Sequence, residues 1–150
     1  MSVGALAKAL KQSNVDRFDF VNFDACLMSS VEIAAVLSEC TDYLILSPET
    51  EPGYGQEYVT WLDALAKEPG MDGYELGKII VDAMIAFYED ETTPGYLQSG
   101  TLAVINTKNF KDRMVAPVTE LAGIMDRELT HIGKNNALLN FEDELRSQAA

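Results

Sequence analysis

The chain has 150 residues, of which 47% are hydrophobic and 23% are charged, and its formal net charge is −13. This length suits one domain with a buried core. The acidic balance argues against binding of nucleic acid or of an anionic membrane surface and favours cationic ligands, including peptides with Lys or Arg and divalent metal ions.

The first half of the sequence predicts alternating helices and strands. An amphipathic stripe predicts a helix over residues 2–12, and an aromatic-rich run predicts a buried strand over residues 18–23. Another helix is expected over residues 29–40, and a second strand over residues 43–47. Strands that alternate with helices in this way predict a parallel sheet with right-handed crossovers.

The second half predicts further helices, a third strand and a weak tail. In chain order these are a helix over 57–66, a helix over 74–88, a strand over 101–106, a helix from Lys108 interrupted near Pro117, and a tail over 133–150 that we expect to be mobile. Trp61, Leu62 and Leu65 are expected to face inward. Three strands are few for such a sheet, since about five or six are typical, so we expect that strands are missing.

Cys26 is the candidate nucleophile. It follows the first predicted strand, at the carboxyl end where the reaction sites of open α/β sheets gather. Ser29 and Glu32 have the spacing of a capping box, so we expect a helix to begin just after Cys26, and a helix amino terminus favours a thiolate. An unpaired cysteine is more often a small buried hydrophobic residue, so both interpretations stay open. Cys40, at the far end of that helix, is expected to be too distant for a disulfide.

A cysteine nucleophile needs a base, most often His. The chain has one His, His131, which lies in the late helical region. Its position favours a surface or helix-end role, because His near a helix carboxyl terminus is stabilised by the helix dipole. The sequence therefore offers a candidate nucleophile without its base.

Acidic residues lie near Cys26 on both predicted loops. Asp24 is expected to point to the same side as Cys26, either as a turn residue or as an anion that pairs with a cationic substrate side chain. Glu49, Glu51 and Glu57 follow the second strand, at the same edge of the sheet. They are either solvated loop carboxylates or residues that line the pocket or help to bind Ca²⁺.

Two motifs resemble one family. The run Phe23-Asp24-Ala25-Cys26-Leu27-Met28, followed by Ser30-Val31-Glu32, resembles the nucleophile segment of clostripain-like cysteine peptidases, which are relatives of caspases, gingipains and legumains. The run Ser47-Pro48-Glu49-Thr50-Glu51-Pro52-Gly53-Tyr54-Gly55 matches a later segment. The resemblance covers roughly residues 3–125. It implies an α/β fold, an incomplete caspase-like three-layer sandwich with a mainly parallel sheet flanked by helices, and makes residues 1–150 the nucleophile-bearing part of a peptidase domain.

The resemblance also implies roles. Cys26 would be the nucleophile of acyl transfer, and Asp24 would lie in the pocket that selects an Arg or Lys side chain of a peptide or protein substrate. Glu49 and Glu51 are further candidates for binding that side chain, from their place on the loop and not from the resemblance. No metal ligand is predicted, although the family suggests Ca²⁺ and a secreted or cell-surface bacterial protein. The family's catalytic His precedes its opening helix, where this chain begins, so we expect an upstream chain or segment to supply it and this chain alone to be inactive. Gln56 after Gly55 also departs from the Gly-Trp common there.

Other functions remain open at this stage. One is a non-catalytic binding or structural domain of the same fold, and another is a small-molecule hydrolase on a flavodoxin-like sheet. The sheet edge left open by missing strands could also pair with a second copy or a partner chain. Neither nucleic acid nor a membrane is expected as a partner.

Overall fold

The computed structural model describes residues 2–96 and 98–133, with side chains as far as Thr130. The chain divides into two compact units, Met1–Phe110 and Lys111–Ala150. The tail predicted for residues 133–150 lies, from residue 134 onward, outside the described residues. Within the described part, no helix is both long and apolar enough to cross a membrane.

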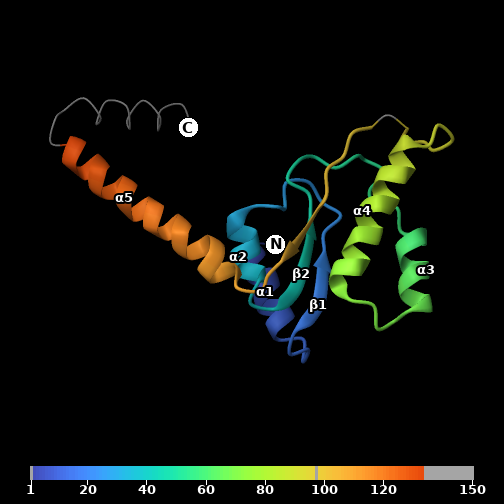
Figure 1. Ribbon diagram of the computed structural model, residues 1–150, viewed down its shortest axis with the longest axis horizontal. Helices are drawn as coiled ribbons and strands as arrows, with labels where there is room; N and C mark the ends of the chain where they lie inside the picture. The colour runs from blue at the N-terminus through green and yellow to red at the C-terminus, as the bar shows by residue number, and fades with distance from the viewer. Residues whose placement is uncertain (1, 97, 134–150) are drawn as a thin grey trace. The chain divides into compact units, whose positions relative to one another are not determined.

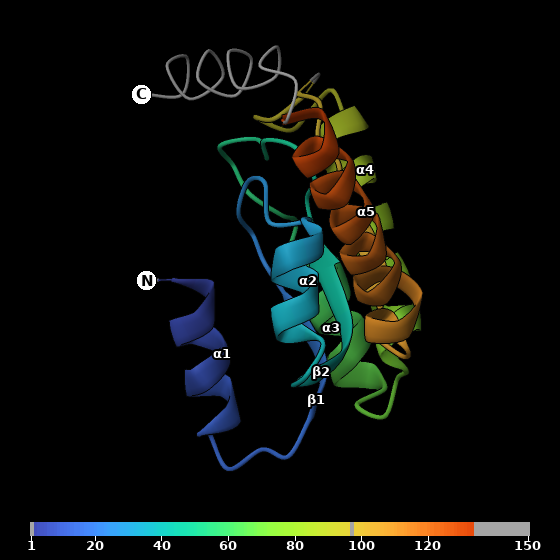
Figure 2. The same ribbon diagram turned by 90° about the vertical axis from the view of Figure 1, so that its left-hand side faces the viewer.

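The first unit has three layers. Its elements are α1 (Val3–Lys11), β1 (Phe18–Asn22), α2 (Val31–Leu37), β2 (Thr41–Leu46), α3 (Val59–Lys67), α4 (Gly73–Glu89) and β3 (Ala103–Asn106). The strand order is β1-β2-β3, so β2 is central. Figures 1 and 2 show α1 and α2 over one face of the sheet and α3 and α4 over the other. This architecture confirms the expected α/β sandwich with flanking helices.

Side chains along β2 alternate between two apolar clusters, one on each face of the sheet. Leu44 and Leu46 pack with Leu37 of α2 on one face, whereas Ile45 packs with Ile80 of α4 on the other. These five side chains have no exposed surface. A strand covered on both faces reads as a continuous apolar run, and burial of each such side chain contributes about 1.5–3 kcal/mol. The core therefore holds β2, and the loop that follows it, in a fixed position.

The sheet departs from a fully parallel one at β3. β1 and β2 are parallel, but β3 is antiparallel to β2, with Leu46 opposite Ala103. The connection between β2 and β3 contains two helices, and α4 runs back toward the carboxyl end of β2, as the hydrogen bond from Tyr88 to Gly55 shows. The chain therefore enters β3 from that end and must run in the opposite direction.

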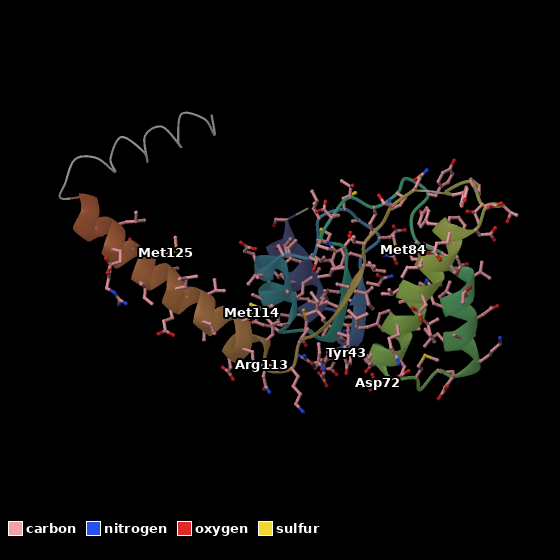
Figure 3. The ribbon with its side chains drawn as sticks, turned by 45° about the horizontal axis from the view of Figure 1, so that its top comes forward. Tyr43, Asp72, Met84, Arg113, Met114 and Met125 are labelled. Atoms are coloured by element: carbon pink, nitrogen blue, oxygen red, sulfur yellow. The ribbon has the colours of Figure 1, made fainter. Side chains whose placement is uncertain are left out.

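The start of α4 lies at the other end of β2. Asp72 caps the helix, and its Oδ1 accepts a hydrogen bond from the backbone N–H of Tyr74 at 2.6 Å. A Cβ on Gly73 would lie 2.7 Å from Cδ2 of Tyr43, so the helix approaches the sheet closely there. Figure 3 labels Tyr43 and Asp72 at this place.

Two local predictions are wrong. The helix after Cys26 begins at Val31, and its cap is Ser30 rather than Ser29, with Ser30 Oγ accepting from the Ile33 N–H. The Ser29 N–H instead donates to the Ser47 carbonyl oxygen at 2.9 Å, which delays the helix. Leu62, expected to face inward, is 47% exposed, although Trp61 is buried.

The second unit begins with a π-helical turn, Lys111–Val115, followed by α5, Ala116–Gly133. Pro117 lies at the start of α5, directly after the change from the π-helical turn to the α-helix. This agrees with the predicted interruption near Pro117. In the described part of this unit, most large apolar side chains are exposed, and Figure 3 labels Met114 and Met125 among them.

Candidate functional site

The loops after β1 and β2 meet at one edge of the sheet, here called the rim. Both strands end there because they are parallel. The backbone N–H of Leu27 donates to the Glu49 carbonyl oxygen at 2.9 Å, and the backbone N–H of Phe23 donates to the Ile45 carbonyl oxygen at 3.0 Å. The structure therefore brings the predicted nucleophile segment and the predicted acidic loop together.

Cys26 lies on the exposed side of this junction. The backbone N–H of Glu51 donates to Cys26 Sγ at 3.2 Å, and the thiol reaches the Glu51 carbonyl oxygen at 3.9 Å. Because α2 begins only at Val31, the expected helix amino terminus directly after Cys26 is absent. The Glu51 N–H is the group that points at the sulfur, and such a donor stabilises negative charge there.

The residue after Cys26 has an unusual backbone conformation. Leu27 has φ 60, in the left-handed region that residues other than glycine seldom adopt. The hydrogen bond from its N–H to Glu49 holds it there. Backbone strain of this kind is concentrated at functional sites, so Leu27 marks the segment independently of Cys26.

Asp24 is held by the loop that follows β2. Its Oδ2 accepts hydrogen bonds from the Gln56 backbone N–H at 3.2 Å and from the Tyr58 hydroxyl at 2.8 Å. Gly55 has φ +72, and a Cβ there would lie 2.6 Å from Asp24 Oδ2. A glycine is therefore required both by the backbone conformation and by the closeness of the carboxylate.

Glu51 lies beside Asp24 and is the least satisfied group of the rim. Both oxygens of its carboxyl group are buried and have no hydrogen-bond partner. Burial first, and then the neighbouring Asp24, raise the pKa of Glu51 to about 7. Glu51 therefore carries a proton for part of the time near neutral pH.

Two tyrosines support the rim as neutral donors. Burial and the neighbouring Asp24 raise the pKa of Tyr58 to about 12, and burial together with Asp24 and Glu51 raises the pKa of Tyr88. The Tyr88 hydroxyl donates to the Gly55 carbonyl oxygen at 2.5 Å. α4 thus supports the loop at the residue that lies against Asp24.

Gln56 is a structural residue that the sequence interpretation missed. It is only 4% exposed. Its Nε2 donates to the Phe23 carbonyl oxygen at 3.0 Å, and its Oε1 accepts from Asn22 Nδ2 at 2.7 Å. In the sequence, Gln56 stands out only as a departure from the Gly-Trp of the family pattern. Nothing in the polarity of the loop distinguishes this glutamine from its exposed neighbours.

The two remaining acidic candidates behave differently from Glu51. Glu49 is exposed, and its backbone rather than its carboxylate takes part in the described hydrogen bonds of the rim. Both oxygens of Glu57 accept hydrogen bonds from the backbone N–H groups of Val59 and Thr60, at 2.7 and 3.0 Å, so Glu57 caps α3. Among the described residues, no three His, Cys, Asp or Glu side chains are grouped so that they could hold a metal ion.

The other candidate residues lie apart from the rim or outside the description. Cys40 is buried in the core and is not bonded to Cys26, as predicted. His131 belongs to α5, in the second unit, and its side chain lies outside the described residues.

Comparisons with known proteins agree on one family. The clostripain family profile matches residues 1–148. A clostripain from Bacteroides thetaiotaomicron is 29% identical, with a TM-score of 0.56 and coverage of 75% of this chain and 45% of that chain. A cysteine protease from B. fragilis is 28% identical, with a TM-score of 0.59 and coverage of 75% and 46%. An inactive zymogen protease from Parabacteroides distasonis is 28% identical, with a TM-score of 0.56 and coverage of 75% and 28%.

No curated protein matches the chain. The chain spans less than half the length of each of these three solved relatives. The family profile nevertheless covers nearly all of it, including the rim with its cysteine and acidic pair. The chain therefore belongs to the clostripain family of cysteine peptidases.

Proposed function

We propose that this chain is the nucleophile-bearing part of a cysteine endopeptidase that cleaves after Arg or Lys. The observation that carries the proposal is the contact of the exposed Cys26 sulfur with the backbone of Glu51, whose carboxyl group neighbours Asp24. A guanidinium or ammonium group is the natural partner for two adjacent carboxylates. The net charge of −13 also attracts cationic peptides.

In the proposed reaction, a base takes the proton of the Cys26 thiol, and the thiolate attacks the carbonyl carbon of the scissile peptide bond. The carbonyl oxygen becomes an oxyanion, which the backbone N–H of Cys26 would stabilise, and such a donor contributes roughly 3–4 kcal/mol. When the C–N bond breaks, the leaving amine takes a proton from the base and a thioester remains on Cys26. Water activated by the same base then hydrolyses the thioester and restores the thiol.

The base is proposed to be a His outside this chain. The only His of the sequence, His131, belongs to the second unit and does not follow a strand. The solved relatives are longer than this chain, and one of them is described as an inactive zymogen. Both facts support an upstream chain or segment as the partner that supplies the His.

The proposed preference for a basic side chain has support from one relative. The clostripain from B. thetaiotaomicron was solved in complex with the peptide inhibitor BTN-VLTK-AOMK, whose peptide letters end in K, the basic residue lysine. The acidic pair belongs to the two loops that hold the candidate nucleophile: Asp24 precedes Cys26 by two residues, and the Glu51 backbone bonds to its sulfur. We infer that Asp24 and Glu51 hold the side chain that precedes the scissile bond.

Turnover of a fluorogenic peptide with Arg before the reporter group tests the need for an external base. The chain alone is expected to show little or no turnover. Robust turnover that disappears in Cys26→Ala would refute this part of the proposal.

Alkylation of Cys26 tests the specificity pocket without turnover. Two peptide chloromethylketones that differ only in carrying Arg or Leu at the reactive end are compared by intact-mass spectrometry. The Arg reagent is expected to label Cys26 faster, and Asp24→Asn is expected to reduce this preference because the variant loses a charge but keeps the shape. Equal rates in the unmodified chain would instead support a non-catalytic domain of the same fold.

A further inference from the structure

A cavity of about 730 Å³ lies between α4 and the segment that leads into β3. A volume of this size is typical of pockets that bind small ligands. The most buried of its lining residues are Met84 and Tyr88 of α4, and Figure 3 labels Met84 on that helix. None of the described lining residues belongs to the acidic pair or to the nucleophile segment, so this cavity is a second site.

The lining of the cavity is suited to hydrocarbon. Val81 and Met84 of α4 and Leu102 before β3 are buried or half-buried, whereas the polar lining residues Glu89 and Gln98 are exposed. Glu89 is the one charged residue among the described lining residues. An apolar side chain would gain free energy by burial here, whereas a carboxylate would meet Glu89 without a neighbouring cation.

Hydrogen bonds fix the cavity against the loop that follows β2. The hydroxyl of Tyr88, whose residue lines the cavity, donates to the Gly55 carbonyl oxygen at 2.5 Å. The hydroxyl oxygen of Thr101, another lining residue, lies 3.2 Å from Ser47 Oγ. The cavity is therefore continuous with the rim and held in place beside it.

The cavity also comes close to the residue that contacts the nucleophile. A Cβ on the lining residue Gly100 would lie 3.2 Å from Cδ of Pro52, and Pro52 directly follows Glu51, whose N–H donates to Cys26 Sγ. In the proposed function, Glu51 holds the basic side chain that precedes the scissile bond. The cavity therefore lies on the side of Cys26 where the substrate segment before that bond would run.

We propose that this cavity is a second specificity pocket, which takes an apolar side chain such as leucine from the substrate segment that precedes the basic residue. The inference rests on the proposed function, because it adds a second contact to the same substrate. The rim would select by charge and the cavity by burial of hydrocarbon. Together they would favour a peptide with an apolar residue upstream of its Arg or Lys.

Four peptide chloromethylketones of equal length test this pocket on the complete 150-residue chain. All end in Arg; the reference has Ala at the three preceding positions, and each of the others has Leu at one of them. Intact-mass spectrometry follows the labelling of Cys26. One of the Leu reagents is expected to label Cys26 at least about tenfold faster than the reference, as burial of one leucine side chain would give. Equal rates for all four reagents would overturn the inference.

Two variants with similar exposure make the assignment specific. Ile85 of α4 lines the cavity and is 49% exposed, whereas Leu62 of α3 is 47% exposed and is not a lining residue. Ile85→Glu places a charge in the pocket and should abolish the advantage of the Leu reagent over the Ala reagent. Leu62→Glu is the matched control and should keep it. An unmodified Cys40 shows that each variant is folded, since Cys40 is buried. An advantage that persists in Ile85→Glu, or that disappears equally in both variants, would overturn the inference.

The methyl signal of Met84 gives an answer that does not depend on alkylation. Met84 is 3% exposed and lines the cavity, and its signal in a chain with ¹³C-methyl methionine is assigned with Met84→Leu. A saturable shift is expected with the acetylated peptide amide that carries the preferred Leu and not with its Ala counterpart. A shift with neither peptide, or the same shift with both, would contradict the proposal. The preference for Arg over Leu at the reactive end tests the rim separately, so the inference can fail while the proposed function stands.

Discussion

The two ends of the sheet in the first unit differ in how far their charged groups are hydrogen-bonded within the fold. At the end away from the rim, Arg17 hydrogen-bonds to the carbonyl oxygens of Ser38 and Thr41, to Thr107 Oγ1 and to the carboxylate of Asp42. Its donors therefore join the segments that flank all three strands. The charge at this end is satisfied within the fold.

At the rim, the charged groups are left partly unsatisfied. Glu51 has two buried oxygens without partners, Leu27 has an unfavourable φ, and Cys26 is exposed. The apolar core and the hydrogen bonds of Arg17 stabilise the fold, whereas the rim contains groups in unfavourable surroundings. The contrast shows where a ligand can add favourable interactions, and it separates residues that maintain the fold from residues that we propose bind a substrate.

Removal of the Arg17 side chain is expected to have the largest effect on stability. Arg17→Ala removes the guanidinium donors to the Ser38 and Thr41 carbonyl oxygens and should lower the free energy of unfolding by about 2–3 kcal/mol. The ion pair with Asp42 adds little, because both side chains are partly exposed. Urea denaturation measures the change, and Arg17→Lys, which keeps the charge but loses the planar fork, should give a smaller loss. An unchanged midpoint for Arg17→Ala would contradict the structural role.

A substitution at Gly55 should damage the rim and leave the other end intact. Gly55→Ala forces a left-handed backbone on a residue with a side chain and places its Cβ against Asp24, which should cost about 1–2 kcal/mol or more. The preference of Cys26 for the Arg chloromethylketone should fall with it. Gly53→Ala is the matched control, because a Cβ there meets nothing within 4 Å. Equal effects of the two variants would show that Gly55 is not a special position.

Glu51 should make the stability of the chain depend on pH. Its pKa is about 7 in the folded chain and near 4.5 otherwise, so the folded state holds the proton more tightly. Stability should therefore fall as pH rises from about 4.5 to about 7, and Glu51→Gln should remove this part of the fall. Denaturation midpoints at several pH values measure the effect. Parallel pH curves for the two proteins would contradict it.

Substitution of Cys26 should have the smallest effect on stability, and the two cysteines should differ most clearly in their reactivity toward a thiol reagent. Cys26→Ala should change stability by no more than about 0.5 kcal/mol, because the side chain is exposed. A small thiol reagent should modify Cys26 in the folded chain and reach Cys40 only upon unfolding, since Cys40 is buried and burial raises its pKa. Equal modification rates in the folded chain would contradict the assignment of Cys40 to the core.

The sequence is sufficient to predict that the two loops meet. A first strand followed by Asp24 and Cys26, and a second strand followed by Glu49 and Glu51, must share an edge if they are parallel. Apolar periodicity also located each helix and strand of the described chain to within a few residues. These features depend on local patterns, which a single sequence carries.

Other features depend on contacts between distant residues. The reversal of β3 follows from where α4 ends, and the burial of Gln56 follows from Asn22 and Phe23 on another strand. The start of α2 is delayed because the Ser29 backbone bonds to β2. Nothing in the loop composition indicates that Glu51 would be buried while Glu49 stays exposed. No local pattern encodes such pairings.

The position of a bound basic side chain is the most direct test of the account. A crystal structure of the chain after alkylation by the Arg chloromethylketone locates both the modified sulfur and the guanidinium. We predict a covalent bond to Cys26 and a guanidinium within about 4 Å of the carboxyl oxygens of Asp24 and Glu51. A guanidinium in solvent without an acidic partner, or a label on Cys40, would contradict the account.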